Sequence, residues 1–284
     1  METLYKLSGA GNDFIVLDGR SGGVDEYRKE LTIRTLCDRN TGFKAADGRV
    51  GADGVMILSS SVDGAWDFVM EYFNSDGSSG MMCGNGGRCI VAFADFLGIV
   101  PANGKFYEFL AADGPHTGEI LARKGRNCTV KLKMKDVSEY RRCTDGWFLD
   151  TGTRHFVKFV DDVEAVDIAT EGPRYRWSEE FAPIGANVNF VQVLPDGSLK
   201  VRTFEKGVED ETLACGTGIT ASALAAQLEA WHKDAGSDTP ASSGTSAKSI
   251  HTAVHARIDE LAVDFTPSGS IFTDVFLTGP AALI

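Results

Sequence analysis

Two cysteines, Cys83 and Cys215, occupy similar places in the sequence. Each opens a Cys-Gly-polar-Gly segment, CGNG at 83–86 and CGTG at 215–218, and apolar residues at helical spacing follow both. Because glycine is unfavourable inside helices and strands, each cysteine is predicted to lie in a turn just before a helix. The first N–H groups of a helix carry partial positive charge and lack partners within the helix. A thiol there is acidified from its free pKa of ~8.5 toward neutrality, and the same N–H groups can hold a carboxylate.

A pair of such helix starts suits proton transfer at an amino-acid α-carbon. The repetition of the segment in both halves indicates a duplicated unit, a pseudo-twofold axis and two turns that face each other across a cleft. The two turns would then grip one carboxylate and place a sulfur on each side of the neighbouring carbon. One thiolate would remove the proton while the opposite thiol delivers one to the other face. The helix ends would stabilise the enolate-like state as it develops, in a site that excludes water.

Other interpretations of these segments stay open at this point. A cysteine before a glycine-rich turn is, taken alone, more often structural than catalytic. Cys83 and Cys89 could form a redox pair, although they lack the usual C-x2-C spacing. Residues 216–221 fit the dinucleotide-binding pattern G-x-G-x-x-A, but the preceding segment is too polar for the required strand and no βαβ unit follows. A binding protein that keeps the fold without turnover is disfavoured, because both cysteines and their glycines are intact.

The elements that must position these cysteines follow a plan that repeats in the two halves. Residues 6–18 predict strand, turn and strand, and residues 24–38 predict a helix. Long helices are predicted from Cys83 to Leu97, ended by Gly98 and Pro101, and over 219–233. Further strands are predicted at 55–60, 66–73, 105–111, 118–124, 128–135, 146–151, 155–160, 188–194, 198–204, 251–258, 261–266 and 270–279. Residues 236–249 predict a polar loop. Many strands with one long helix per half predict an α+β fold rather than a βαβ series.

Composition narrows the classes of function. The 284 residues carry a net charge of −12 and show no basic tract, which argues against nucleic-acid partners. The apolar runs are short, and the N-terminus lacks a signal-peptide pattern, so we expect a cytoplasmic protein without a membrane span. No cysteine pair has C-x2-C spacing, and no metal site is expected. Cys37, Cys128 and Cys143 are expected to be small apolar core residues.

The chain resembles the diaminopimelate epimerases. The matching segments are GAGNDFIVLD (9–18), GADG (51–54), FNSDGSSGMMCGNGGRC (73–89), GANVNFV (185–191) and EKGVEDETLACGTG (205–218). The resemblance implies two pseudo-symmetric α+β domains, each a mostly antiparallel sheet wrapped around a central helix. The expected domains are 1–118, joined by a returning strand at 272–284, and 119–271.

The resemblance also implies an activity. The activity is the cofactor-independent interconversion of LL- and meso-diaminopimelate, a small amino-acid substrate, in lysine and peptidoglycan-precursor biosynthesis. The enzyme is expected to be a homodimer. Another cofactor-independent amino-acid racemase or epimerase of the same fold is the alternative.

Site residues follow from the same resemblance. Cys83 and Cys215 match the acid/base pair, and His155 and Glu205 match positions that tune or orient the thiols. Gly84 with Asn85, and Gly216 with Thr217, match the residues that bind the reacting carboxylate. Residues matched to other substrate contacts are Asn12, Asn74, Asn187, Thr153 and Lys206. For Asn74, in FNSDG, the interpretation from the residues alone is turn formation.

The sequence departs from the family pattern at three places, none of which includes the two cysteines. Thr153 stands where the family usually has Asn or Ser followed by Pro, and it cannot donate two amide hydrogens. Lys206 replaces an Arg that holds the distal carboxylate, so the charge is kept and the two-pronged contact is lost. Arg154 is a hypothetical substitute for that contact. The loop 42–50 resembles an insertion before GADG and leaves the role of Gly54 open.

Overall fold

The computed structural model describes residues 2–235 and 248–284 and divides into two compact units. Unit 1 is Met1–Leu132 with Gly279–Ile284, and unit 2 is Lys133–Thr278. The expected boundary at 118/119 differs from this division: it lies within the strand Gly114–Lys124, which pairs with the next strand of the same unit. The returning C-terminal segment likewise begins at Gly279 rather than at residue 272. Of the predicted loop 236–249, residues 236–247 lie outside the described residues.

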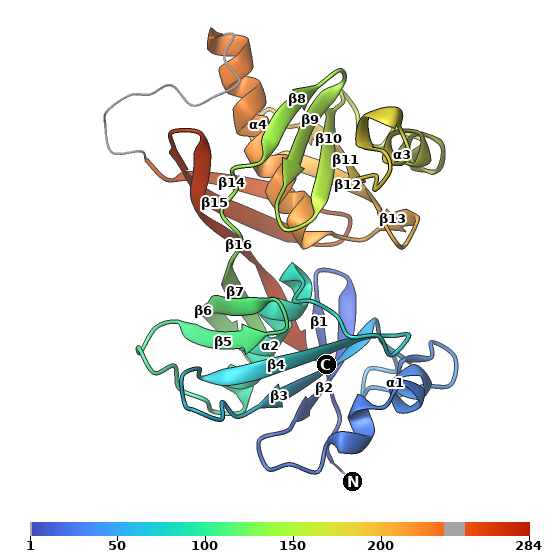
Figure 1. Cartoon of the computed structure of the whole chain (residues 1–284), viewed down its shortest axis with the longest axis vertical. Coiled ribbons are helices and arrows are strands. Elements are labelled where there is room, and N and C mark those ends of the chain that lie inside the picture. The colour runs from blue at the N-terminus through green and yellow to red at the C-terminus, as the bar shows by residue number, and fades with distance from the viewer. Residues whose placement is uncertain (1, 236–247) are drawn as a thin grey trace. The chain divides into compact units, whose positions relative to one another are not determined.

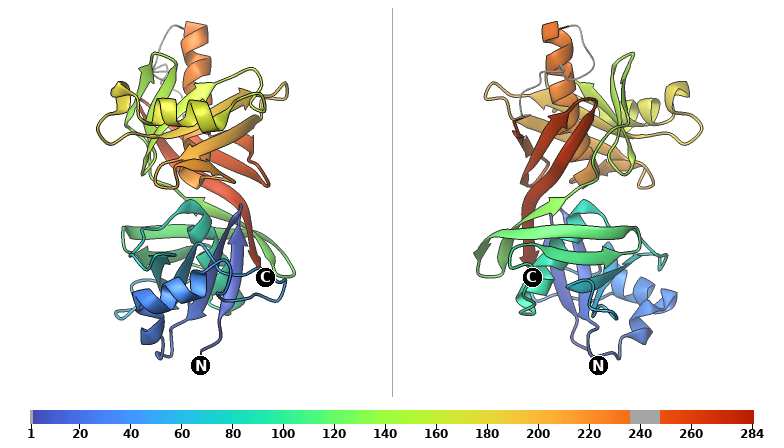
Figure 2. Two further views of the ribbon diagram at one scale, coloured as in Figure 1. Left: turned by 90° about the vertical axis from the view of Figure 1, so that its right-hand side faces the viewer. Right: turned by 60° about the vertical axis from the view of Figure 1, so that its left-hand side comes forward.

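Unit 1 is a strand-rich unit around one long helix (Figure 1). Its elements are β1 (Tyr5–Gly9), β2 (Asn12–Asp18), η1 (Asp25–Arg28), α1 (Glu30–Cys37), β3 (Gly54–Ser59), β4 (Phe68–Asn74), α2 (Gly84–Phe96), β5 (Tyr107–Ala111), β6 (Gly114–Lys124) and β7 (Asn127–Lys133). The end of β16 (Ile271–Leu283) pairs antiparallel with both β7 and β1 and completes the unit's sheet. In both views of Figure 2 this red end of β16 lies beside the strands of unit 1.

Unit 2 repeats the plan. Its elements are β8 (Tyr140–Cys143), β9 (Gly146–Asp150), β10 (Arg154–Phe159), α3 (Ile168–Arg176), η2 (Glu179–Phe181), β11 (Asn187–Val193), β12 (Leu199–Glu205), β13 (Asp210–Thr212), α4 (Gly216–Ala235), β14 (Ile250–His255), β15 (Glu260–Ser268) and the first part of β16. Most strand pairs are antiparallel. The parallel pairs β2–β3, β4–β5, β10–β11 and β12–β14 occur where the chain passes through a helix between the two strands. The predicted α+β fold, with an internal repeat, is confirmed.

The register shows which residues of the two units correspond. In unit 1, Gly54 at the start of β3 lies opposite Phe14 of β2 and opposite Asn74 of β4. Unit 2 has Asn187 at the start of β11, opposite His155 of β10. The β11–β12 register, continued by one residue past its last pair, sets Asn187 beside Glu205. The positions of His155 and Glu205 in unit 2 are therefore those of Phe14 and Asn74 in unit 1.

The two long helices are the centres of their units. In α2, every residue from Gly84 to Ala94 is buried, although three of its first four residues are glycines and the helix contains an arginine. In α4, Ile219, Leu224 and Leu228 are buried, and the helix contacts strands on several sides, including β9, β10, β11, β12, β14 and β15. No helix in the described part of the chain combines the length and apolar character needed to cross a membrane.

The sequence prediction missed some elements. The helix expected over 24–38 is a 3-10 turn, Asp25–Arg28, followed by the short helix α1. Helix α3 was not predicted because it contains Gly172 and Pro173 and has few apolar residues. Gly172 is packed so closely on Phe204 that a Cβ there would lie 2.5 Å from the ring. The short strands β8 and β13 were also missed.

Candidate active site

The CGNG segment of unit 1 forms the start of α2, as predicted. Cys83 has extended backbone angles at the N-cap position, and its Sγ accepts a hydrogen bond from the N–H of Gly86 at 3.2 Å. The N–H of Gly87 donates to the carbonyl of Cys83 at 2.8 Å and begins the helix. The sulfur therefore lies in the field of the helix N-terminus, where negative charge is stabilised.

Asn85 is held in place by two other polar side chains. Its Nδ2 donates to Oδ1 of Asn12 at 2.7 Å. Its Oδ1 accepts from the guanidinium of Arg88 at 2.7 Å, and Arg88 also donates to the carbonyl of Gly84 at 3.1 Å. Arg88 is fully buried. Its guanidinium thus folds back along α2 and places positive charge beside the first turn of the helix.

Asn12 is linked in turn to an ion-pair cluster at the start of β2. Its Nδ2 donates to Oδ2 of Asp53 at 2.9 Å, and the same oxygen accepts from the N–H of Asp13 at 3.0 Å. Arg39 bridges Asp53 and Asp13, and the Lys6 ammonium lies 2.7 Å from Asp13. Sequence reasoning missed this network and Arg88. Arg88 could have been found from the sequence, because it is a charged residue within the mostly apolar helix α2.

Asn74 lies in the turn that leads from β4 toward α2. Its side-chain amide donates to the hydroxyl of Ser78 at 3.0 Å, and its backbone carbonyl accepts from Gly77 at 2.9 Å. The side chain therefore takes part in the turn, in agreement with the interpretation from the residues alone.

The CGTG segment of unit 2 likewise forms the start of a helix, α4, which begins at Gly216. The N–H of Ile219 donates to the carbonyl of Cys215 at 2.8 Å. Cys215 is 9% exposed, and its Sγ lies 3.4 Å from the hydroxyl of Thr217. The predicted relation between cysteine and helix start is thus present in both units.

His155 connects Thr217 to the strands of unit 2. Its Nε2 lies 2.9 Å from the hydroxyls of both Thr217 and Thr153, which are 3.3 Å apart. Its Nδ1 lies 3.1 Å from the side-chain amide of Asn189, a residue that sequence reasoning missed. Burial lowers the pKa of His155 from 6.5 to about 3, so the imidazole is neutral at physiological pH.

Asn187, Glu205 and Lys206 meet at the end of β12. Asn187 donates to the carbonyl of Arg154 at 2.9 Å and accepts from the N–H of Lys206 at 2.8 Å. Glu205 accepts from the hydroxyl of Thr212 at 2.9 Å. The Lys206 residue is exposed, and Asn187 is buried. Asn187 thus fixes the backbone on both sides of it, at Arg154 and at Lys206.

The hypothesis that Arg154 replaces a substrate-binding arginine is not supported. Its guanidinium carbon lies 5.2 Å from the ring centroid of Phe148, and the group donates to the carbonyl of Phe181 at 3.4 Å. Because neighbouring residues of a strand point to opposite faces, Arg154 faces away from His155, whose ring contacts the hydroxyl of Thr153.

The other cysteines differ from Cys83 and Cys215. All six are free thiols. Burial raises the pKa of Cys89 to about 12, that of Cys143 to about 12 and that of Cys37 to about 11. These thiols are protonated at neutral pH, as expected of core residues, and a thiol of that kind is a poor redox partner for Cys83.

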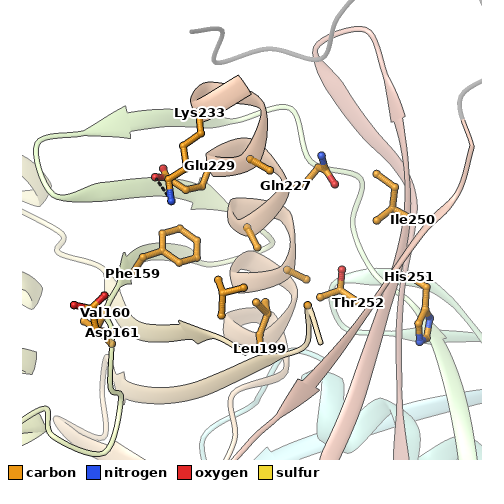
Figure 3. Close-up of a pocket in the computed structure, with 15 residues that line it drawn as sticks. Phe159, Val160, Asp161, Leu199, Gln227, Glu229, Lys233, Ile250, His251 and Thr252 are labelled. Atoms are coloured by element: carbon orange, nitrogen blue, oxygen red, sulfur yellow. Dashed lines mark ion pairs between the residues drawn. The ribbon is translucent and has the colours of Figure 1, made fainter. Parts of the chain in front are cut away.

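A cavity of about 660 Å³ in unit 2 lies away from these residues (Figure 3). It lies between α4 and the start of β14, and Phe159, Leu199, Gln227 and Thr252 are among its lining residues. The ion pair Glu229–Lys233 lies at its edge. None of its lining residues belongs to the group around Cys215. Among the described residues, no three or more His, Cys, Asp or Glu side chains are grouped as a metal site requires.

Comparison with known proteins gives consistent results. The family model for diaminopimelate epimerase matches residues 4–114 and 147–267. The diaminopimelate epimerase of Flavobacterium psychrophilum is 39% identical over 283 residues, which cover 99% of this chain and 97% of that protein. The diaminopimelate epimerase of Chlorobaculum tepidum is 43% identical, over 77% of this chain and 80% of that protein.

Solved structures share the fold at low sequence identity. A phenazine biosynthesis protein of the PhzF family from Bacillus anthracis has a TM-score of 0.66 at 10% identity, over 99% of this chain and 96% of that one. A hydroxyproline epimerase from Agrobacterium vitis, solved with trans-4-hydroxy-L-proline, has a TM-score of 0.62 at 14% identity, over 99% and 88%.

Proposed function

Because the chain belongs to the diaminopimelate epimerase family, we propose that it interconverts LL- and meso-diaminopimelate in lysine and peptidoglycan-precursor biosynthesis. One observation carries the proposal: in each unit a cysteine lies directly before a central helix. The first turn of each helix contains glycines, whose lack of side chains leaves the backbone N–H groups accessible. Such a position both activates a thiol and binds a carboxylate. The substrate is a small amino acid, and the reaction is an isomerisation.

In the proposed mechanism, Cys83 and Cys215 act on opposite faces of one α-carbon. The thiolate of one cysteine takes the α-proton, and the electron pair of the broken C–H bond delocalises into the carboxylate. The thiol of the other cysteine then delivers its proton to the opposite face, so the two sulfurs exchange protonation states. Gly84 with Asn85, and Gly216 with Thr217, are proposed to hold the carboxylate as its charge increases.

His155 is proposed to orient groups rather than to transfer protons. An imidazole that stays neutral at physiological pH is a weak base, but it is a good hydrogen-bond donor. Its contacts with Thr153 and Thr217 set the direction of the Thr217 hydroxyl beside Cys215. Glu205 and Asn187 are proposed to shape the same side of the site from the end of β12.

The alternative, another amino-acid racemase or epimerase of this fold, is not favoured. The curated relatives that match most of the chain are diaminopimelate epimerases. Thr153 and Lys206 are proposed to contact the distal end of the substrate. We also propose a homodimer in the cytoplasm, which sedimentation analysis and cell fractionation would test.

Exchange of α-hydrogen in heavy water tests the function. The wild-type protein should exchange the α-hydrogen of meso-diaminopimelate and should leave proline and monocarboxylic amino acids unchanged. Cys83→Ala and Cys215→Ala should each abolish epimerisation, whereas Cys128→Ala, a change of a thiol in β7, should retain it. Epimerisation by either of the first two variants would contradict the two-cysteine mechanism. Exchange with proline instead would favour the alternative.

A further inference from the structure

A buried amide, Asn189, contacts Nδ1 of His155, the ring nitrogen that does not face Thr217. Its Nδ2 is within hydrogen-bond distance of Nδ1 of His155, at 3.1 Å, and of the carbonyl of Phe156, at 3.2 Å. Its Oδ1 accepts from the hydroxyl of Thr203 at 2.9 Å. Asn189 and His155 are both fully buried.

These contacts fix the orientation of the amide. The carbonyl of Phe156 is only an acceptor, so the group of Asn189 that faces it must be the NH2 group. A flipped amide would set two oxygens against each other and would also turn its NH2 toward the Thr203 hydroxyl. The NH2 group therefore faces His155 as well, and Nδ1 of the imidazole must be the acceptor.

The orientation of the amide determines which nitrogen of His155 carries the proton. An imidazole with an accepting Nδ1 that stays neutral carries its proton on Nε2. From Nε2 the proton can be donated to Thr217 directly, or to Thr153, whose hydroxyl then donates to Thr217. Either route fills an acceptor position of the Thr217 hydroxyl and leaves the proton of Thr217 free to point at Sγ of Cys215.

We propose that Asn189 is a positioning residue that fixes the tautomer of His155, so that the hydrogen bonds run from Asn189 through His155 and Thr217 to the sulfur of Cys215 as acceptor. A donor at the sulfur stabilises thiolate over thiol. Asn189 thereby keeps Cys215 ready to accept a proton. The inference rests on the proposed function only in taking Cys215 as one of the two acid/base residues.

The first experiment measures the tautomer in the wild-type protein. Long-range ¹H–¹⁵N spectra at pH 7.5 distinguish protonated from unprotonated ring nitrogens, and comparison with His155→Gln identifies the signals of His155. We expect a protonated Nε2 and an unprotonated Nδ1. A protonated Nδ1 would overturn the proposal, and no variant has to fold for this result to be decisive.

The second experiment reverses the polarity at position 189. Asn189→Asp keeps the size of the side chain but offers an acceptor to Nδ1, so above the pKa of the His–Asp pair Nε2 becomes an acceptor and competes for the hydroxyl protons. At pH 8.5, iodoacetamide labelling of Cys215 relative to Cys83 in the same molecule should slow about tenfold, the equivalent of one pKa unit. Thr203→Val is the matched control: it removes one hydrogen bond to the same amide, leaves the contact to His155, and should keep the labelling ratio.

An unchanged labelling ratio in Asn189→Asp, with ring-nitrogen signals that show the switched tautomer, would contradict the role of Asn189. Neither readout requires turnover. If the protein shows the expected tautomer and labelling but does not exchange the α-hydrogen of diaminopimelate, the inference about Asn189 stands and the proposed function is wrong.

Discussion

Asn85, in the first turn of α2, donates a 2.7 Å hydrogen bond to Asn12 at the start of β2. The bond joins two residues that the resemblance matches to substrate contacts, and both ends are fixed by ionic groups. Arg88 holds the oxygen of Asn85, and Asp53 holds the NH2 group of Asn12. The polar network around Asn85 in unit 1 therefore contains charged side chains, whereas the side chains that contact the ring of His155 in unit 2, those of Thr153, Thr217 and Asn189, are neutral.

Replacing Arg88 should impair catalysis more than substrate binding. Arg88→Met removes the donor that orients Asn85 and a positive charge beside the helix start, so we expect kcat to fall by about tenfold to a hundredfold. Arg88→Lys keeps the positive charge but lacks the planar guanidinium, so its kcat should lie between those of the wild-type protein and Arg88→Met. Steady-state kinetics and iodoacetamide labelling of Cys83, with Cys215 as internal reference, measure the effect. A wild-type kcat in Arg88→Met would exclude a role for the guanidinium.

The link from Asp53 to Asn12 should affect substrate affinity. In Asp53→Asn the carboxylate that accepts from Asn12 and from the N–H of Asp13 is replaced by a neutral amide, and we expect KM to rise by about tenfold. Arg39→Gln is the control, because it removes the ion pairs with Asp53 and Asp13 but leaves both hydrogen bonds to the Asp53 carboxylate. If the two variants raise KM equally, the ion pair rather than the contact to Asn12 is responsible.

Acid should destabilise the protein through His155. The imidazole has a pKa of about 3 in the folded state against 6.5 for an exposed group. Below pH 6.5 the unfolded chain therefore binds a proton that the folded protein does not, so the free energy of unfolding falls as the pH falls. The slope approaches ~1.4 kcal/mol per pH unit between about pH 6 and pH 4.

Urea unfolding at several pH values checks this prediction. His155→Gln should show a smaller loss of stability between pH 6.5 and pH 4 than the wild-type protein, whatever its stability at pH 7. Carboxylates such as Glu71, whose pKa is lowered by the Arg28 guanidinium, titrate in both proteins and cancel in the comparison. Parallel curves for the two proteins would show that His155 binds its proton equally in both states.

The sequence predicted the elements that carry strong local signals. The glycines before each long helix, and the apolar residues within it, were sufficient to place Cys83 and Cys215 at helix starts. Helix α3 has no such signal, since its packing depends on the close approach of Gly172 to Phe204 of a distant strand. The boundary between the units could not be predicted either. The sequence indicates β6 and β7 as two strands but does not show that they pair with each other and so belong to the same unit.

The polar networks around the cysteines could be predicted only in part. Asn187 and Asn189 lie two residues apart on the same strand, and nothing local distinguishes them. The parallel register of β10 and β11 decides that Asn187 is paired with His155 in the backbone, while the side chain of Asn189 reaches its ring. Asp53 and Asn12, 41 residues apart, are likewise joined only by the fold.

Gly218 and Gly86, the last glycines of the two CGxG segments, should differ in their tolerance of a side chain. A Cβ at Gly218 would lie 2.3 Å from Oδ1 of Asn189. The amide of Asn189 cannot move without breaking the hydrogen bonds of its Oδ1 to Thr203 and of its Nδ2 to His155. A Cβ at Gly86 would lie 3.2 Å from Sγ of Cys83, a separation that a shift of a few tenths of an ångström relieves. We expect Gly218→Ala to destabilise the protein by about 1–3 kcal/mol, and to slow labelling of Cys215, whereas Gly86→Ala should cost less. Thermal unfolding and labelling of both cysteines in each variant measure the difference. Equal losses of stability would mean that the amide of Asn189 adjusts freely, which is incompatible with its fixed orientation beside His155.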